Sequence, residues 1–166
     1  MKISISDKDK ALIRAFQCGL PLASTPYREI AVKAGWDTDS ALQRITELRE
    51  FGVIRRICAF IKQENVGYGA NAMAVWDVPE EKVDEIGHEL AKSNLVSHCY
   101  ARQRNEKFPF NLYTMMHGKS RDGIISEVEK LSHELGISNY RILFTIRELK
   151  RSTPVFFKEH NDDIKR

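Results

Sequence analysis

Two histidines in short apolar runs near the middle of the sequence are the residues best suited to chemistry. His98 lies in the run Val-Ser-His-Cys-Tyr at residues 96–100, and His117 lies in the run Asn-Leu-Tyr-Thr-Met-Met-His-Gly at residues 111–118. Imidazole readily gives up a proton near neutral pH, and Tyr113 in the second run can orient a reacting group. Either histidine is alternatively an axial ligand to iron in a macrocycle, or an ordinary strand residue.

The two runs predict an antiparallel hairpin, because both are rich in strand-favouring residues and the segment between them is polar. If Tyr100 pairs with Asn111, His98 lies opposite Tyr113, and His117 lies farther along the same face. A slip of one residue would reverse that relation, and the sequence alone does not set the register.

Arginines elsewhere in the chain could bind carboxylates, because each planar guanidinium can donate two parallel hydrogen bonds to one carboxylate. Arg55 and Arg56 follow the first third of the chain, and Arg102 and Arg104 lie between the two runs. The alternative is that they only keep the surface soluble. The sequence has no glycine-rich phosphate loop, nucleophile elbow or paired-carboxylate motif, so its chemistry points to an anion pocket with imidazole groups.

The composition is that of a globular protein of one or two domains: 166 residues, 42% hydrophobic and 30% charged. Three widely spaced cysteines, Cys18, Cys58 and Cys99, fit reduced thiols, and the charged first ten residues lack a signal core, so we expect a cytoplasmic protein without membrane spans. Because adjacent strand residues point to opposite faces, His98 and Cys99 cannot share a metal ion without a bulge. The net charge of +3 permits an acidic ligand without requiring nucleic acid.

The first third predicts a winged helix-turn-helix domain over residues 1–64. Helical spacing and caps indicate helices after Ser6 or Asp7, over residues 27–34 and after Asp37 or Thr38, and residues 53–57 alternate like a strand. Residues 36–51, in the place of a recognition helix, carry four carboxylates and two arginines. Since affinity for DNA comes largely from neutralising phosphates, this negative charge argues against DNA as a partner.

The remainder predicts a ferredoxin-like domain over residues 65–152, which makes the protein α+β. The order is a strand at residues 71–78, a helix after Pro79, the hairpin, a helix capped by Ser120, and a strand at residues 140–146. The first strand is apolar on both faces, so we expect a sheet-to-sheet dimer or a ligand pocket on the side without helices. Residues 153–166 form a tail, which is either a solvated extension or a basic arm that reaches a ligand or partner.

Several motifs resemble those of one protein family. They are Leu-Pro-Leu at residues 20–22, Pro-Tyr at 26–27, Gly-Val-Ile-Arg-Arg at 52–56, Asn-Ala-Met-Ala-Val-Trp at 71–76, the two histidine runs, and Arg-Glu-Leu-Lys at 147–150. The overall layout resembles the Lrp/AsnC family of regulators. The motifs in detail resemble its siroheme decarboxylase branch, in the alternative heme and heme d1 pathways.

That resemblance implies an enzyme that removes the C12 and C18 acetate carboxyls of siroheme as CO2, giving 12,18-didecarboxysiroheme. It implies a pair of homologous subunits and no cofactor beyond the iron tetrapyrrole substrate, whose ring takes up the negative charge. On this hypothesis His117 donates the proton that completes each methyl group, His98 is a second acid or an iron ligand, and Tyr113 orients the reacting group.

The same hypothesis assigns the binding of substrate to arginines and to two residues of the hairpin. These are Arg55, Arg56, Arg102, Tyr100 and Asn111. Phe-Pro-Phe at residues 108–110 stands where the family carries Trp-Pro-Tyr, which leaves open whether this subunit holds the catalytic pocket or supports that of its partner. The alternatives are a regulator or heme sensor that binds DNA, and a tetrapyrrole-binding subunit without turnover.

Overall fold

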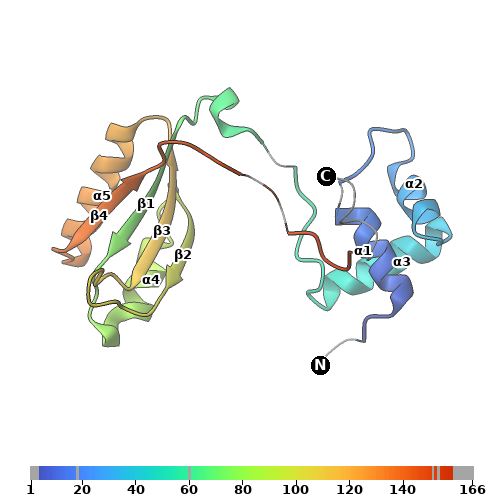
Figure 1. The fold of residues 1–166 in the computed structure, drawn as a ribbon, viewed down its shortest axis with the longest axis horizontal. Coiled ribbons are helices and arrows are strands. Elements are labelled where there is room, and N and C mark those ends of the chain that lie inside the picture. The colour runs from blue at the N-terminus through green and yellow to red at the C-terminus, as the bar shows by residue number, and fades with distance from the viewer. Residues whose placement is uncertain (1–3, 18, 60, 151, 153, 159–166) are drawn as a thin grey trace. The chain divides into compact units, whose positions relative to one another are not determined.

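The chain folds into two units, which we describe separately. The computed structural model describes residues 4–17, 19–59, 61–150, 152 and 154–158. Unit 1 comprises Met1–Ala59 together with Arg151–Arg166, and unit 2 comprises Phe60–Lys150 (Figure 1). Unit 2 is therefore inserted between two segments of unit 1.

Unit 1 contains the three predicted helices, α1 (Asp7–Gln17), α2 (Pro26–Lys33) and α3 (Thr38–Glu50). The carboxylate of Asp37 caps α3 by accepting a hydrogen bond from the backbone N–H of Ser40 at 2.9 Å. The helices enclose a small apolar core made of Leu12, Ala15, Ile30, Ala31, Ala34, Ala41 and Ile45.

A buried ion pair joins the first and third helices. Asp9 is only 2% exposed, and its two carboxylate oxygens accept hydrogen bonds from Nε and Nη2 of Arg44 at 2.7 and 2.9 Å. Ser6 completes the site, since its hydroxyl donates to Asp9 while accepting from the Asp9 backbone N–H. The Arg44 guanidinium is the main cause that lowers the pKa of Asp9 to about 2.

The strand predicted at residues 53–57 is wrong. Residues 53 and 54 form a bend, and residues 55–57 have no regular secondary structure. Only Ile54 packs against the helices, whereas Val53 and Ile57 remain 40% and 46% exposed. A strand needs a partner ladder, and in the described part of unit 1 no second strand lies beside this segment.

The tail of the chain is bound to α1. The side-chain amide of Gln17 donates to the carbonyl of Phe156 at 2.8 Å and accepts from its N–H at 2.9 Å. The Arg14 guanidinium donates to the carbonyl of Phe157 at 3.1 Å. Residues 156 and 157 therefore belong to unit 1 through backbone hydrogen bonds that do not depend on their side chains.

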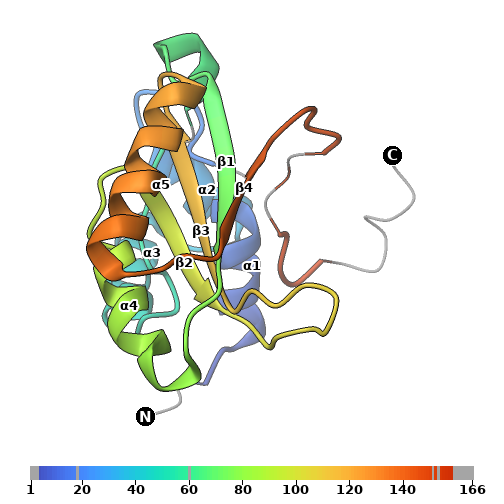
Figure 2. The same ribbon diagram turned by 90° about the vertical axis from the view of Figure 1, so that its left-hand side faces the viewer.

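Unit 2 has the predicted order of strands and helices. These elements are β1 (Ala70–Trp76), α4 (Val83–Leu90), β2 (Val96–Ala101), β3 (Leu112–Gly118), α5 (Arg121–Leu135) and β4 (Tyr140–Phe144), with short 3-10 turns at Gln63–Val66 and Glu80–Lys82. The strands form one antiparallel sheet in the order β2-β3-β1-β4. Both helices cover the same face (Figures 1 and 2), which confirms the ferredoxin-like arrangement.

The face under the helices holds the core of unit 2. Alternate residues of β1 and β3 are buried there, together with Ile124 and Val128 of α5. In this layer the indole N–H of Trp76 donates to the hydroxyl of Thr114 at 2.9 Å, and that hydroxyl donates to the carbonyl of Ala74 at 3.3 Å. Ser120 caps α5 as predicted, by accepting from the N–H of Gly123.

The hairpin forms as predicted, and the structure gives the register that the sequence left open. Tyr100 pairs with Tyr113 rather than Asn111, and His98 pairs with Met115. A bulge interrupts the ladder between Val96 and His98, because Val96 pairs with Met116 and one extra residue is accommodated there. The extra residue is Ser97, and it changes which side chains share a face.

Candidate active site

Most of the site residues predicted in unit 2 lie on the side of the sheet away from α4 and α5, which we call the open face. It is lined by Asn71, Met73 and Val75 of β1, Ser97, His98 and Tyr100 of β2, Tyr113, Met115 and His117 of β3, and Arg141 and Leu143 of β4. These side chains form rows across the strands. Tyr100, Tyr113, Val75 and Arg141 make one row, and His98, Met115, Met73 and Leu143 make the next.

Polar groups at one end of the open face form a connected chain, which we call the imidazole cluster: Asn71, His117, Ser97 and His98. Nδ1 of His117 lies 2.6 Å from the amide oxygen of Asn71, and Nε2 lies 2.8 Å from the hydroxyl of Ser97. The same hydroxyl lies 3.0 Å from Nδ1 of His98, and it donates a hydrogen bond to the carbonyl of Met115 at 3.2 Å. The two histidines are thus joined through one hydroxyl.

The bulge explains how Ser97 reaches both rings. In a regular strand Ser97 and His98 would point to opposite faces. With the extra residue, Val96 points toward the helices and packs against the core, while the Ser97 hydroxyl and His98 both reach the open face. Cys99 points toward the core, where burial raises the pKa of its thiol.

The other end of the open face is aromatic and basic. The Arg102 guanidinium lies over the ring of Tyr113, 5.2 Å from its centroid, and that of Arg141 lies over the ring of Phe110 at 5.5 Å. Phe108 packs edge-on against Phe110. Cations held over aromatic faces keep their hydrogen-bond donors at the edge, where an anion can meet them.

The remaining predicted residues of unit 2 take different positions. Tyr113 is half-buried, and its hydroxyl donates to the carbonyl of Phe110 at 3.2 Å. Tyr100 is 52% exposed and stacks on His98 with ring centroids 5.9 Å apart. Asn111 is 1% exposed, and its amide bonds both the N–H and the carbonyl of Val78. Asn111 therefore holds the turn after β1 and presents no group to the open face.

The arginines are divided between the units. Arg55 and Arg56 are exposed in the segment of unit 1 that has no regular secondary structure. In unit 2, Arg104 is held by Asp77 and by the carbonyls of Val78 and Pro109. Arg104 is thus engaged, whereas Arg102 keeps its guanidinium over a ring at the surface.

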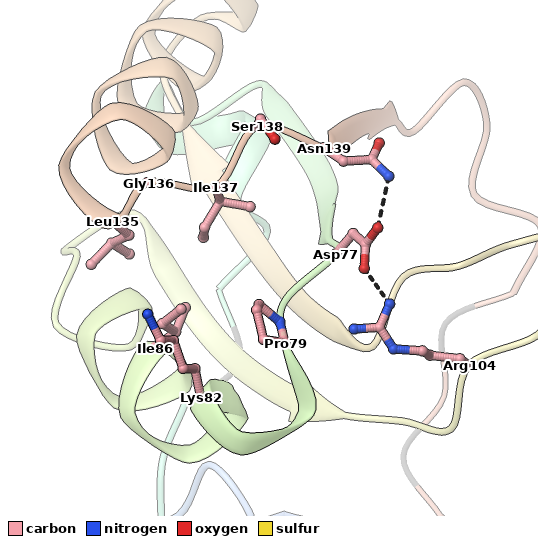
Figure 3. A pocket seen from close by; sticks show the side chains of 10 residues that line it. All are labelled: Asp77, Pro79, Lys82, Ile86, Arg104, Leu135, Gly136, Ile137, Ser138 and Asn139. Atoms are coloured by element: carbon pink, nitrogen blue, oxygen red, sulfur yellow. Dashed lines mark hydrogen bonds and ion pairs between the residues drawn. The ribbon is translucent and has the colours of Figure 1, made fainter.

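A hollow of about 380 Å³ lies at another end of unit 2, between the turn after β1 and the loop after α5 (Figure 3). Asp77 bridges Arg104 and Asn139 on one wall, Lys82 lies across from them, and Ile86 lies beside Lys82. The pKa of Asp77 is lowered mainly by the hydrogen bond from Arg104 and to a smaller extent by the hydrogen bond from Asn139. Because Arg104 is already paired with Asp77, Lys82 is the one remaining cation among the described residues that line this hollow, which makes it a poor match for a ligand that carries several carboxylates.

Sequence reasoning missed Asn71, Ser97 and Arg141. A polar residue in an otherwise apolar strand was a signal for Asn71, but the bulge that turns Ser97 toward His117 leaves no mark in the sequence. Among the described residues, no three His, Cys, Asp or Glu side chains gather into a metal site, and no helix is long and apolar enough to cross a membrane.

Two family models match this chain. Residues 9–55 match the siroheme decarboxylase NirDL-like helix-turn-helix domain, and residues 65–150 match the AsnC-like ligand-binding domain. The chain is 38% identical to a siroheme decarboxylase of Hydrogenobacter thermophilus, over 93% of this chain and 46% of that protein. It is 34% identical to a siroheme decarboxylase beta subunit of Oleidesulfovibrio alaskensis, over 95% of this chain and all of the subunit.

A solved structure agrees with these relatives. The siroheme decarboxylase NirDL, crystallised in co-complex with an iron-uroporphyrin III analogue, superposes with a TM-score of 0.69 at 35% identity, over 95% of this chain and 49% of that chain. The chain thus spans about half of two of these relatives and the whole length of the third. By sequence and by fold, it belongs to the siroheme decarboxylase family.

Proposed function

We propose that this chain is a subunit of a siroheme decarboxylase that removes the C12 and C18 acetate carboxyls of siroheme as CO2. The observation that carries the proposal is the similarity, over nearly the whole chain, to a protein that is itself a single subunit of that enzyme. The related enzyme crystallised with an iron-uroporphyrin analogue supports an iron tetrapyrrole as the ligand class.

The open face suits a flat, acidic ring system. Met73 and Met115 lie between the aromatic row and the imidazole cluster, and methionine packs adaptably against flat apolar surfaces. His117 lies four positions after Tyr113, which places the two ends about 13 Å apart along β3. A macrocycle can rest on the methionines while its carboxylates meet Arg102 and Arg141 at one end.

The chemistry needs an acid and no organic cofactor. When an acetate side chain loses CO2, the electron pair of the broken C–C bond is left on the methylene carbon and is delocalised into the ring. One proton then forms the methyl group. His117 and His98 are the imidazoles of the open face, and they serve as the acid, while Tyr113 holds the aromatic end in place through Phe110.

The substrate carboxylates that face away from the reaction need cationic partners. Arg102 is available on the open face, and Arg55 and Arg56 are exposed on unit 1. Asn111 supports the site by fixing the Val78 turn. Tyr100, stacked on His98, limits the rotation of that imidazole.

A second, homologous subunit is the proposed partner. The Oleidesulfovibrio relative is a beta subunit, and the Hydrogenobacter relative is about twice as long as the region it shares with this chain. An open sheet face with Leu143 46% exposed also favours a covering partner. The free thiols of Cys58 and Cys99 support a cytoplasmic location.

The competing function is a regulator that binds DNA. Helix α3 carries two arginines, and Arg44 is bound by Asp9 and by Glu47 at 2.6 Å. Because the positive charge of Arg44 is paired with these two carboxylates, the surface of α3 remains acidic, which opposes contact with phosphates. Salt-dependent binding to a promoter fragment would favour the regulator.

The deciding experiment is decarboxylation by the chain purified with its partner subunit. Siroheme is added without oxygen, and the product is analysed by mass spectrometry for the loss of one or two CO2 units. We expect two losses. Binding of siroheme without any loss of mass would identify a non-catalytic subunit and contradict the proposal.

A further inference from the structure

We infer that Ser97 links the two imidazoles into one proton path that runs from His117 through the Ser97 hydroxyl to His98 and then to the substrate carbon. The inference rests on the proposed function. Its basis is the geometry of the imidazole cluster, in which one hydroxyl lies within 3.0 Å of a nitrogen of each ring.

Asn71 determines how His117 is protonated. An amide oxygen only accepts hydrogen bonds, so Nδ1 of His117, 2.6 Å from it, must carry a proton. A second proton on the ring is therefore held at Nε2, which faces Ser97 at 2.8 Å. Both ring nitrogens of His117 are engaged, and the proton that it can release points at the Ser97 hydroxyl rather than at the open face.

His98 has the complementary arrangement. Its Nδ1 lies 3.0 Å from the Ser97 hydroxyl, and among the described residues its Nε2 has no hydrogen-bond partner. His98 is exposed on the open face, whereas His117 is half-buried. His98 thus presents an N–H to the substrate while its other nitrogen faces the relay.

The transfer balances in one concerted step. The Ser97 O–H first turns from the carbonyl of Met115 to Nδ1 of His98. The substrate carbanion then takes the proton from Nε2 of His98, the Ser97 proton moves to Nδ1 of His98, and the Nε2 proton of His117 moves to the Ser97 oxygen. His117 ends as a neutral ring that keeps its Nδ1 proton on Asn71. When a solvent proton later enters at Nε2 of His98, the same steps in reverse recharge His117. Each CO2 released therefore consumes one solvent proton.

The test uses the complex with its partner subunit and compares Ser97→Ala with Ser97→Thr. General acid catalysis contributes about 10²–10⁴-fold, so we expect Ser97→Ala to lower the single-turnover rate by about 10²-fold with siroheme affinity unchanged. Ser97→Thr keeps the hydroxyl and should stay within a few-fold of the wild type. The matched control is Ser126→Ala on the exposed surface of α5.

The number of protons that move in the transition state distinguishes a proton relay through Ser97 from a structural role of that residue. Rates in mixtures of H2O and D2O should curve for the wild type, because several protons move together, and should become linear for Ser97→Ala. A wild-type rate in Ser97→Ala, or equal losses in the Ala and Thr variants, would overturn the relay. So would a His98→Gln variant that changes only the absorption spectrum of the bound iron tetrapyrrole, because His98 would then be an iron ligand. If the wild-type complex releases no CO2, the proposed function fails instead.

Discussion

The ion pair between Asp9 and Arg44 should stabilise unit 1 by about 2 kcal/mol at neutral pH. The pKa of Asp9 lies at about 2 in the folded protein, against an ordinary value of 3.8. At about 1.4 kcal/mol for each pKa unit, the whole difference corresponds to about 2.5 kcal/mol, of which the Arg44 pair supplies the largest part and the hydrogen bonds from Ser6 a smaller part. Because the folded pKa is lowered, this stability is present above about pH 4 and is lost as the pH falls toward 2. Asp9→Asn should therefore cost about 2 kcal/mol at pH 7, and the cost should shrink on acidification.

The measurement is urea unfolding followed by tryptophan fluorescence at pH 7, 5, 3.5 and 2.5. The chain has two tryptophans, so all variants carry Trp76→Phe and only Trp36 reports. Trp36 belongs to unit 1, where its indole N–H donates to the carbonyl of Lys8 at 3.1 Å. Asp7→Asn is the control, because Asp7 is exposed at the surface, where it pairs with Lys10. A cost for Asp9→Asn that stays constant from pH 7 to 2.5 would refute the assignment of the lowered pKa to this pair.

Three further predictions concern unit 2. Thr114→Val leaves the buried Trp76 N–H without its partner and should cost about 1–3 kcal/mol in unfolding free energy, whereas Thr114→Ser should cost much less. Gly118→Ala places a Cβ 2.9 Å from Cγ1 of Ile124, so we expect about 1–3 kcal/mol of overpacking and, in a double-mutant cycle with Ile124→Ala, a sum that is less than additive. Arg141→Ala should weaken siroheme binding by roughly tenfold or more in a spectroscopic titration of the complex, from the loss of a charged hydrogen bond.

Each of these has an outcome that contradicts it. Equal unfolding midpoints for Thr114→Val and Thr114→Ser would mean that the indole finds another partner. Strict additivity in the Gly118 cycle would mean that the close approach is relieved elsewhere. For Arg141, the control is Arg121→Ala, since Arg121 lies over Phe144 on the helix-covered side of the sheet. Equal affinities of the two arginine variants would exclude Arg141 from the binding surface.

Much of the fold followed from local signals in the sequence. Asp37 and Ser120 cap helices where their side chains can accept backbone N–H groups, and the alternating apolar residues of β3 bury one face of the sheet. These features depend on neighbours a few residues away, so the sequence was enough to predict them.

Features that depend on contacts between distant segments could not be predicted from the sequence. Residues 53–57 alternate like a strand, yet a strand forms only if a partner strand lies beside it. The hairpin register depended on one extra residue at Ser97, whose position is set by the core packing of Val96 and by contacts of the hydroxyl across the sheet. Asn111, a predicted substrate ligand, lies against the turn at Val78, 33 residues away in sequence. No local pattern reports such a contact.

The attachment of the tail to α1 has a consequence for how the protein is made. Gln17 and Arg14 bind backbone groups of Phe156 and Phe157, which are separated from them in the chain by all of unit 2. A ribosome that has finished the three helices has not yet produced the segment that completes them. The helix-turn-helix unit therefore acquires these hydrogen bonds only after the ferredoxin-like unit has been synthesised. Unit 1 cannot form all of its contacts until almost the entire described chain has left the ribosome.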